Sequence, residues 1–141
     1  MYSTARHYGI NQYASVHIEG GLQDASPHRL IQMLLEGLIS RMASARGALL
    51  RGDTVVRGEQ LSKALAILGG LEGALDYERG GELAVNLRDL YRYITHRLLL
   101  VTSDNDVRLL DEALGLIREI KAGWDAIPAS LHTAVAQEQA G

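Results

Sequence analysis

The fold is decided by the stretch Leu71–Ile94, which reads LEGALDYERGGELAVNLRDLYRYI. Gly80-Gly81 is predicted to end one helix, because glycine adopts the left-handed conformation at little steric cost. Glu82 follows, where the positive end of a new helix favours a carboxylate. Apolar residues then recur at helical spacing behind it, namely Leu83, Leu87, Leu90/Tyr91, Ile94 and Leu98. The stretch therefore predicts a corner between two helices around which the rest of the chain packs.

Two helices are predicted on the N-terminal side of this corner. Ser26 is a good N-cap and Pro27 fits the first position of a helix. Gly52 then supplies a stop, and Asp53 follows at once as a new cap. A connection this short makes consecutive helices antiparallel neighbours. The second and third helices are predicted over about Val55 to Leu75 and Gly81 to about Thr102.

A fourth helix follows the third after a short polar break. Ser103 and Asp106 stand at the spacing of a capping box, and Pro128 ends the apolar pattern behind them. The predicted fold class is all-α, an antiparallel up-down-up-down four-helix bundle with an N-terminal arm or short helix. Its predicted divisions are an arm at 1–25, the bundle at 26–128 and a mobile tail at 129–141.

Composition restricts the class of protein. The chain has 141 residues, 47% apolar and 22% charged, which is typical of one soluble domain. Its net charge of −3 gives no reason to expect nucleic acid as a partner. With no cysteine, thiolate metal sites and disulfides are excluded. Without a signal-peptide pattern or an apolar run of about 20 residues, a cytoplasmic protein with no membrane insertion is expected.

Motifs of catalysis, of cofactor binding and of metal binding are absent from the sequence. The five histidines are scattered, and none has the Glu-x-x-His spacing of a di-iron bundle. No phosphate-binding glycine loop or zinc-protease motif occurs. His96, in the middle of the third helix, would suit a phosphotransfer domain, but its surroundings equally suit an ordinary surface histidine. We therefore expect no enzyme, no metal and no cofactor.

The remaining feature is apolar surface in excess of what a bundle needs. The first helix carries a second apolar stripe of Ile31, Leu35 and Ile39, and the second helix adds Ile67. These stripes predict contact with the N-terminal arm, with a second copy of the chain, or with an amphipathic helix of another protein. The second helix also contains three glycines, which allow either close helix packing or close approach of a bound segment, namely Gly69, Gly70 and Gly73.

An ordered series of motifs gives the chain a family resemblance. The series consists of INQYASV at 10–16, ASPHRLIQML at 25–34, Gly52-Asp53, LSKA at 61–64, LDYERGGELAVNL at 75–87, LYRY at 90–93 and AGW at 122–124. From Tyr2 through Trp124 the sequence resembles the flagellin-specific export chaperone family, FliS.

This resemblance implies a cytosolic helical bundle that binds the disordered C-terminal segment of flagellin before export. It also implies that the chaperone prevents premature polymerisation and presents flagellin to the export-gate component FlhA. Other flagellar regulators are possible partners within the family. The family's N-terminal arm lies over part of the binding surface, and Ile10 and Tyr13 match its functional positions.

We expect Ile10 and Tyr13 to form a displaceable lid. The residues expected to line or support the groove beneath it are Leu65, Leu68, Leu87, Tyr91 and Ile94. Ordering a disordered partner costs about 2–5 kcal/mol or more, so the contact surface must be extensive. Two alternatives remain: a self-associating structural or adaptor bundle, and a histidine phosphotransfer domain centred on His96.

Overall fold

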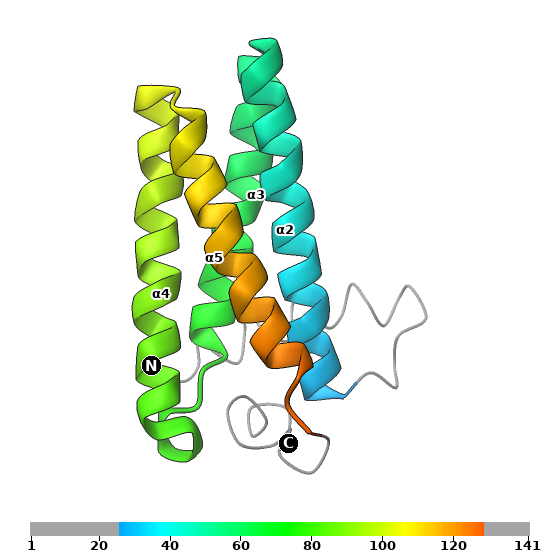
Figure 1. Ribbon diagram of the computed structural model, residues 1–141, viewed down its shortest axis with the longest axis vertical. Coiled ribbons are helices and arrows are strands. Elements are labelled where there is room, and N and C mark those ends of the chain that lie inside the picture. The colour runs from blue at the N-terminus through cyan, green and yellow to red at the C-terminus, as the bar shows by residue number, and fades with distance from the viewer. Residues whose placement is uncertain (1–25, 129–141) are drawn as a thin grey trace.

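The computed structural model describes residues 26–128. The described part of the chain is all-α, as the sequence predicts. Its helices are α2 (Pro27–Arg51), α3 (Thr54–Gly73), α4 (Tyr77–Asp104) and α5 (Val107–Asp125). They form a four-helix bundle in which consecutive helices run in opposite directions (Figure 1). The expected arm and tail, with Ile10 and Tyr13 in the arm, lie outside the described residues.

The four helices form a closed ring. α2 packs against α3 and α5, and α4 packs against α3 and α5. In Figure 1, α5 lies in front of α3, with α2 and α4 on either side. Each helix therefore has two neighbours, so the first and last helices of the chain lie side by side.

Because each helix packs against two neighbours, the apolar residues of the second stripes are buried between helices. Ile31 and Leu35 of α2 are both buried in the common core, and Ile67 of α3 is buried with them. Only Ile39 remains partly buried. Ile31, Leu35 and Ile67 are therefore part of the core and are not in excess of what the bundle needs, because a helix with two neighbours requires a wide apolar face.

The termini of α2 are capped as the sequence predicts. Ser26 accepts a hydrogen bond from the backbone N–H of Arg29 at 3.0 Å, directly before Pro27. Gly52 ends the helix in the left-handed conformation, with φ 74°. Asp53 then accepts a hydrogen bond from the N–H of Val56 at 3.1 Å and caps α3. These caps satisfy backbone groups that a helix end leaves unpaired.

The corner between α3 and α4 lies earlier in the chain than predicted. α3 ends at Gly73, and Asp76 caps α4 by accepting hydrogen bonds from the N–H groups of Glu78 and Arg79. Gly81 has non-helical backbone angles and separates a short first segment of α4, which begins at Tyr77, from the longer segment behind it, so the chain does break at the glycine pair as predicted. This break is a kink inside α4, with φ 52° and ψ −126° at Gly81. The aspartate cap was missed because the two glycines offered a stronger stop signal.

The corner between α4 and α5 also differs in its details. Asn105 ends α4 in the left-handed conformation, with φ 52°. Asp106, rather than Ser103, caps α5 by accepting a hydrogen bond from the N–H of Arg108 at 2.9 Å. The hydroxyl of Ser103 instead donates to the carbonyl of Leu100 in the last turn of α4. Asparagine tolerates the left-handed conformation, which places the helix end two residues later.

Within residues 26–128, no helix is both long and apolar enough to span a bilayer. The core runs the length of the bundle, and Ile94 and Leu98 of α4 lie at its centre with no exposed surface. Leu99 of the same helix faces outward and is 53% exposed.

Burial predicts that truncation to alanine has a large effect at one residue of α4 and a small effect at another. We expect Ile94→Ala to lower the free energy of unfolding by roughly 2–5 kcal/mol, because it leaves a cavity in the core. Leu99→Ala, the matched control on the exposed face, should change it by no more than about 0.5 kcal/mol. Chemical denaturation monitored by circular dichroism measures both. Equal losses in the two variants would contradict this account of the core.

Two glycines predict a pair of opposite outcomes. Gly81 has a positive φ that other residues rarely adopt, so Gly81→Ala should destabilise the fold by about 1–3 kcal/mol. Gly69 is helical and exposed, and a Cβ there would meet nothing within 4 Å. Gly69→Ala should therefore stabilise the fold by about 0.5–1 kcal/mol. Thermal melts measure both variants. Shifts in melting temperature of the same sign would contradict this account.

Candidate partner-binding pocket

An apolar pocket opens between the first half of α4 and the end of α5. Its volume is about 270 Å³. α4 contributes Leu83 and Leu87, and the end of α5 and the residues after it contribute Ile120, Trp124 and Ile127. Leu83 is 48% exposed at the rim, whereas Trp124 is only 6% exposed. The pocket therefore combines an accessible apolar rim with a buried aromatic wall.

Local sequence explains why the pocket is open. Leu83 lies two residues after the kink at Gly81, in the first turn of the straight part of α4. Gly123 lines the pocket from α5, and a Cβ there would meet nothing within 4 Å. Glu119 is the one charged residue in the lining. Such a hollow suits an apolar side chain from a partner and offers no convergent polar groups for chemistry.

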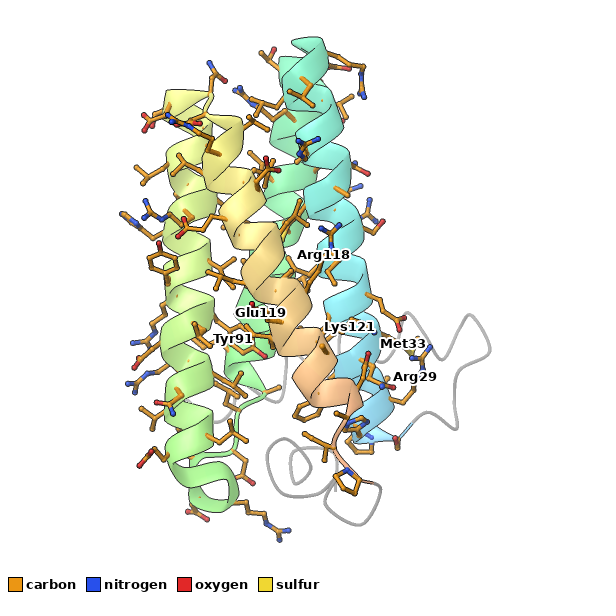
Figure 2. The ribbon with its side chains drawn as sticks, in the orientation of Figure 1. Arg29, Met33, Tyr91, Arg118, Glu119 and Lys121 are labelled. Atoms are coloured by element: carbon orange, nitrogen blue, oxygen red, sulfur yellow. The ribbon has the colours of Figure 1, made fainter. Side chains whose placement is uncertain are left out.

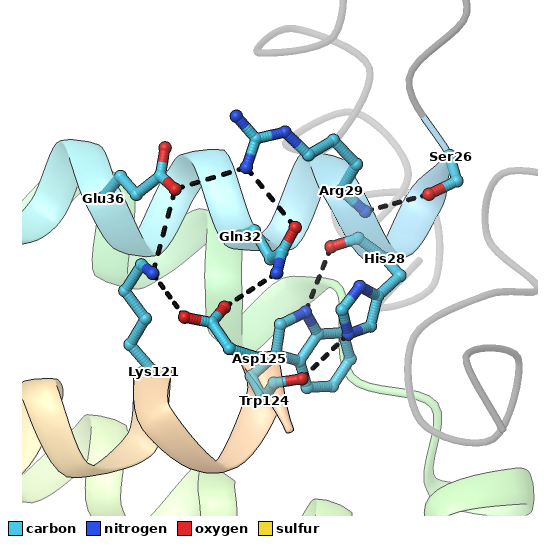
Figure 3. A network of polar contacts seen from close by, with 8 residues as sticks. All are labelled: Ser26, His28, Arg29, Gln32, Glu36, Lys121, Trp124 and Asp125. Carbon is cyan, nitrogen blue, oxygen red and sulfur yellow. Dashed lines mark hydrogen bonds and ion pairs between the residues drawn. The ribbon is translucent and has the colours of Figure 1, made fainter. Parts of the chain in front are cut away.

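Trp124 is held in place by a reciprocal pair of contacts with His28 at the start of α2 (Figure 3). The indole Nε1–H donates to the carbonyl of His28 at 3.0 Å, and His28 Nε2 lies 2.9 Å from the carbonyl of Trp124. Because a carbonyl oxygen only accepts, Nε2 carries the proton and donates. The two rings also stack, with centroids 4.6 Å apart and planes 9° from parallel. We call this pair of residues the His28–Trp124 clasp.

A polar network joins the same two helix ends on the surface (Figure 3). Asp125 of α5 accepts hydrogen bonds from the Gln32 amide of α2, at 2.7 Å, and from Lys121 of its own helix. Lys121 also lies 3.8 Å from Glu36 of α2, which pairs with Arg29 at 3.2 Å. These exposed pairs each contribute little stability, but together they fix how the end of α5 lies on α2.

The electrostatics of this network act mainly on Asp125. The hydrogen bond from Lys121 lowers the pKa of the Asp125 carboxyl, and the hydrogen bond from Gln32 and the charges of Lys121 and His28 lower it further. Partial burial opposes them. Asp125 is therefore a carboxylate at neutral pH, paired with a cation beside the pocket.

The residues predicted to form the groove divide into two groups. Leu87 lines the pocket and is 9% exposed. Leu68, Tyr91 and Ile94 are buried in the core, and Figure 2 shows Tyr91 reaching from α4 toward the inside of the bundle. Leu65 is partly buried against the core. In this structure the buried residues support the bundle from within, and whether a partner reaches any of the five stays a prediction.

Burial also affects the one ionisable group among them. Removal from water raises the pKa of the Tyr91 phenol, because the charged form is disfavoured there. Tyr91 is thus a neutral core residue at any ordinary pH.

Sequence signals are weaker for the residues that make the pocket accessible. Leu83 belonged to the predicted stripe, but the stripe did not distinguish its exposed position from the buried ones behind it. Trp124 was part of the AGW motif and is the single tryptophan of the chain. His28 stands in the motif that opens α2. No periodic pattern indicates a contact between residues 96 positions apart.

Two further hollows among the described residues are lined by a mixture of polar and apolar residues. One lies between α2 and α5, where Arg46 and Asp111 pair and Arg118 completes the lining. Arg118 and Lys121 both lie on the side of α5 toward α2 (Figure 2). The other lies at the opposite end of the bundle, where Arg57 donates to Asn105. Neither hollow has the apolar lining of the pocket between α4 and α5.

Two features that bear on metal binding and phosphotransfer can be placed in the described part of the chain. Residues 26–128 contain no group of three or more side chains that could hold a metal ion. His96 is exposed on α4, as expected for an ordinary surface histidine.

Comparisons with known proteins point to one family. A family model described as flagellar protein FliS matches residues 9–131. The flagellar secretion chaperone FliSB of Pseudomonas aeruginosa is 50% identical over 118 residues, which cover 84% of this chain and 94% of that protein. FliS of Salmonella typhimurium is 45% identical over 120 residues, covering 84% and 89%. FliS of Vibrio cholerae is 38% identical over 129 residues, covering 92% and 95%.

The lowered pKa of Asp125 predicts an acid-dependent contribution to stability. Its folded-state pKa lies below the unfolded value of about 3.9, so the contribution is present above pH 4 and is lost as pH falls further. We expect Asp125→Asn to lower stability slightly at pH 7, by no more than about 1 kcal/mol because the residue is exposed. The difference from the parent protein should shrink toward pH 2 in thermal melts. A difference that stayed constant over this range would contradict the assignment.

Proposed function

The chain belongs to the FliS family of flagellar secretion chaperones, and from this premise we propose that its cargo is the C-terminal segment of flagellin. The family is one of chaperones, so the chain is an export chaperone and not an enzyme. The motif resemblance gives flagellin as the cargo and its C-terminal segment as the bound part. Chaperoning needs recognition of an exposed segment but no chemical step, which fits a bundle with an apolar pocket.

The pocket between α4 and α5 is the observation that carries this proposal. An unfolded segment with amphipathic helical patterning would place an apolar side chain against Leu83, Leu87 and Trp124. Burying such a side chain in a pre-formed hollow stabilises the complex by about 1.5–3 kcal/mol. One pocket is too small to offset the cost of ordering a long segment, so the segment must extend over further parts of the bundle.

Binding of this kind would protect the cargo. The apolar face that a flagellin segment buries on the chaperone is then unavailable for contacts between flagellin subunits. We propose that the chaperone acts in the cytosol, prevents premature polymerisation and delivers flagellin to the export-gate component FlhA. Other flagellar regulators are further possible partners within this proposal.

The N-terminal arm has a separate place in the proposal. Ile10 and Tyr13 act as a displaceable lid, which covers apolar surface of the free chaperone and leaves it when cargo binds. Leu65, Leu68, Tyr91 and Ile94 support the surface from the core, and Leu87 touches the cargo. Support for this division comes from the burial of Leu68, Tyr91 and Ile94 and from the place of Leu87 in the pocket.

Two exposed leucines of α4 provide the test. A C-terminal flagellin segment encoded in the same genome should bind the chaperone in calorimetry. Leu83→Asp should weaken that binding at least about tenfold, because it places a carboxylate at the apolar rim. Leu99→Asp, the control on the same helix, is similarly exposed but lies outside the pocket lining and should leave affinity unchanged.

Two outcomes would contradict the proposal. Absence of binding by the parent protein would contradict flagellin as the cargo. Equal effects of Leu83→Asp and Leu99→Asp would contradict the pocket as its site. Sedimentation over a range of concentrations tests the alternative of a self-associating bundle, which requires a dimer that Leu83→Asp dissociates and that flagellin does not affect.

A further inference from the structure

We propose that His28 is a positioning residue for cargo binding: its ring holds the Trp124 indole in the orientation that forms a wall of the apolar pocket. His28 does not line the pocket itself. The inference rests on the proposed function of that pocket, and it adds a residue on a different helix to the determinants of affinity.

The geometry of the clasp confines the indole of Trp124. Trp124 is fixed at three points by His28: at the indole N–H, at its backbone carbonyl and across the face of its ring. His28 is only 4% exposed, so the imidazole is itself confined. An indole held at its edge and on its face has one orientation available. The part of Trp124 turned toward Leu83 and Leu87 is therefore pre-formed before any partner arrives.

Ordering the Trp124 side chain has a cost in free energy. A partner that binds beside a mobile tryptophan must order that side chain, which costs about 0.5–1.5 kcal/mol. Because the clasp already orders the indole in the folded protein, this cost does not reduce the affinity for a partner. Removing the imidazole would return the cost to the binding step, and this corresponds to an affinity about two to ten times weaker.

The imidazole is not needed to join α2 to α5. Gln32 and Asp125 join the same two helix ends through side chains, at 2.7 Å. The carbonyl of Trp124 also accepts from the N–H of Ile127 at 3.2 Å, so it keeps a donor without His28 Nε2. The indole N–H bonds to the backbone of His28 and does not need its side chain. Among the three contacts of the clasp, the one that holds the indole and needs the imidazole is therefore the stack.

The experiment uses Trp124 as its own reporter, because it is the single tryptophan of the chain. The variants are His28→Ala, which removes the ring, and His28→Phe, which keeps a ring to stack but loses the donor. Gln32→Ala is the control, since it removes one side-chain hydrogen bond between the same ends of α2 and α5 without touching the indole. Each full-length protein is tested for helix content, for iodide quenching of tryptophan fluorescence, and for calorimetric affinity toward the C-terminal flagellin segment.

We expect His28→Ala to increase iodide quenching and to weaken cargo binding about two- to tenfold. His28→Phe should restore both properties to near the parent values, and Gln32→Ala should leave both unchanged. Rescue by the phenyl ring would assign the effect to the stack rather than to the hydrogen bond.

Other results would overturn the inference in distinct ways. If His28→Ala binds the segment as tightly as the parent, His28 has no positioning role and the proposed function stands. If Gln32→Ala weakens binding as much as His28→Ala, the effect belongs to helix joining and not to the indole. If the parent binds no flagellin segment, the proposed function fails and this inference fails with it. If His28→Ala loses its helix content, the test rests on His28→Phe. If His28→Phe is folded but differs from the parent in affinity and in iodide quenching, the role of the stack is overturned.

Discussion

The contact between the first helix of the bundle and the last is the constraint on which the rest of the structure depends. Short turns connect α2 to α3, α3 to α4 and α4 to α5, so the chain itself keeps these pairs adjacent. Nothing covalent closes the ring between α2 and α5. The His28–Trp124 clasp makes this closure at one end of the bundle, between residues 96 positions apart, and the Gln32–Asp125 hydrogen bond lies beside it. The same closure places the tryptophan where α4 and α5 leave a pocket.

The division between core and surface explains how a chaperone uses such a bundle. Leucine, isoleucine and alanine side chains fill the space between the four helices, and Tyr91 joins them as a neutral residue. A close-packed interior keeps the helices in fixed positions, so the pocket has a definite shape in the absence of cargo. In the function we propose, recognition depends on a few residues at the edge of the core, with Leu83 exposed and Trp124 nearly covered.

Much of the fold was predictable from sequence, because local signals determine it. The cap at Ser26, the stop at Gly52 and the apolar periodicity of each helix were confirmed. The errors arose where two local signals competed. The break at Gly80-Gly81 is present as a kink with non-helical angles at Gly81, but the short helical segment that Asp76 caps before it was not predicted. A glycine pair shows where the backbone is permissive, but only the packed structure decides whether a turn or a kink results.

The candidate site was less predictable, and the reason is geometric. A stripe of apolar residues shows which face of a helix is buried, but not where burial ends. Ile94 and Leu83 belong to the same stripe of α4, although one is fully buried and the other is half exposed at the pocket rim. The clasp could not be predicted at all, because it depends on how two helices distant in sequence meet. Hydrogen–deuterium exchange of the whole chain, with and without full-length flagellin, tests the central claim most directly. The account predicts new protection concentrated in residues 77–90 and 117–128, and protection confined to the opposite end of the bundle, around 48–57 and 103–108, would contradict it.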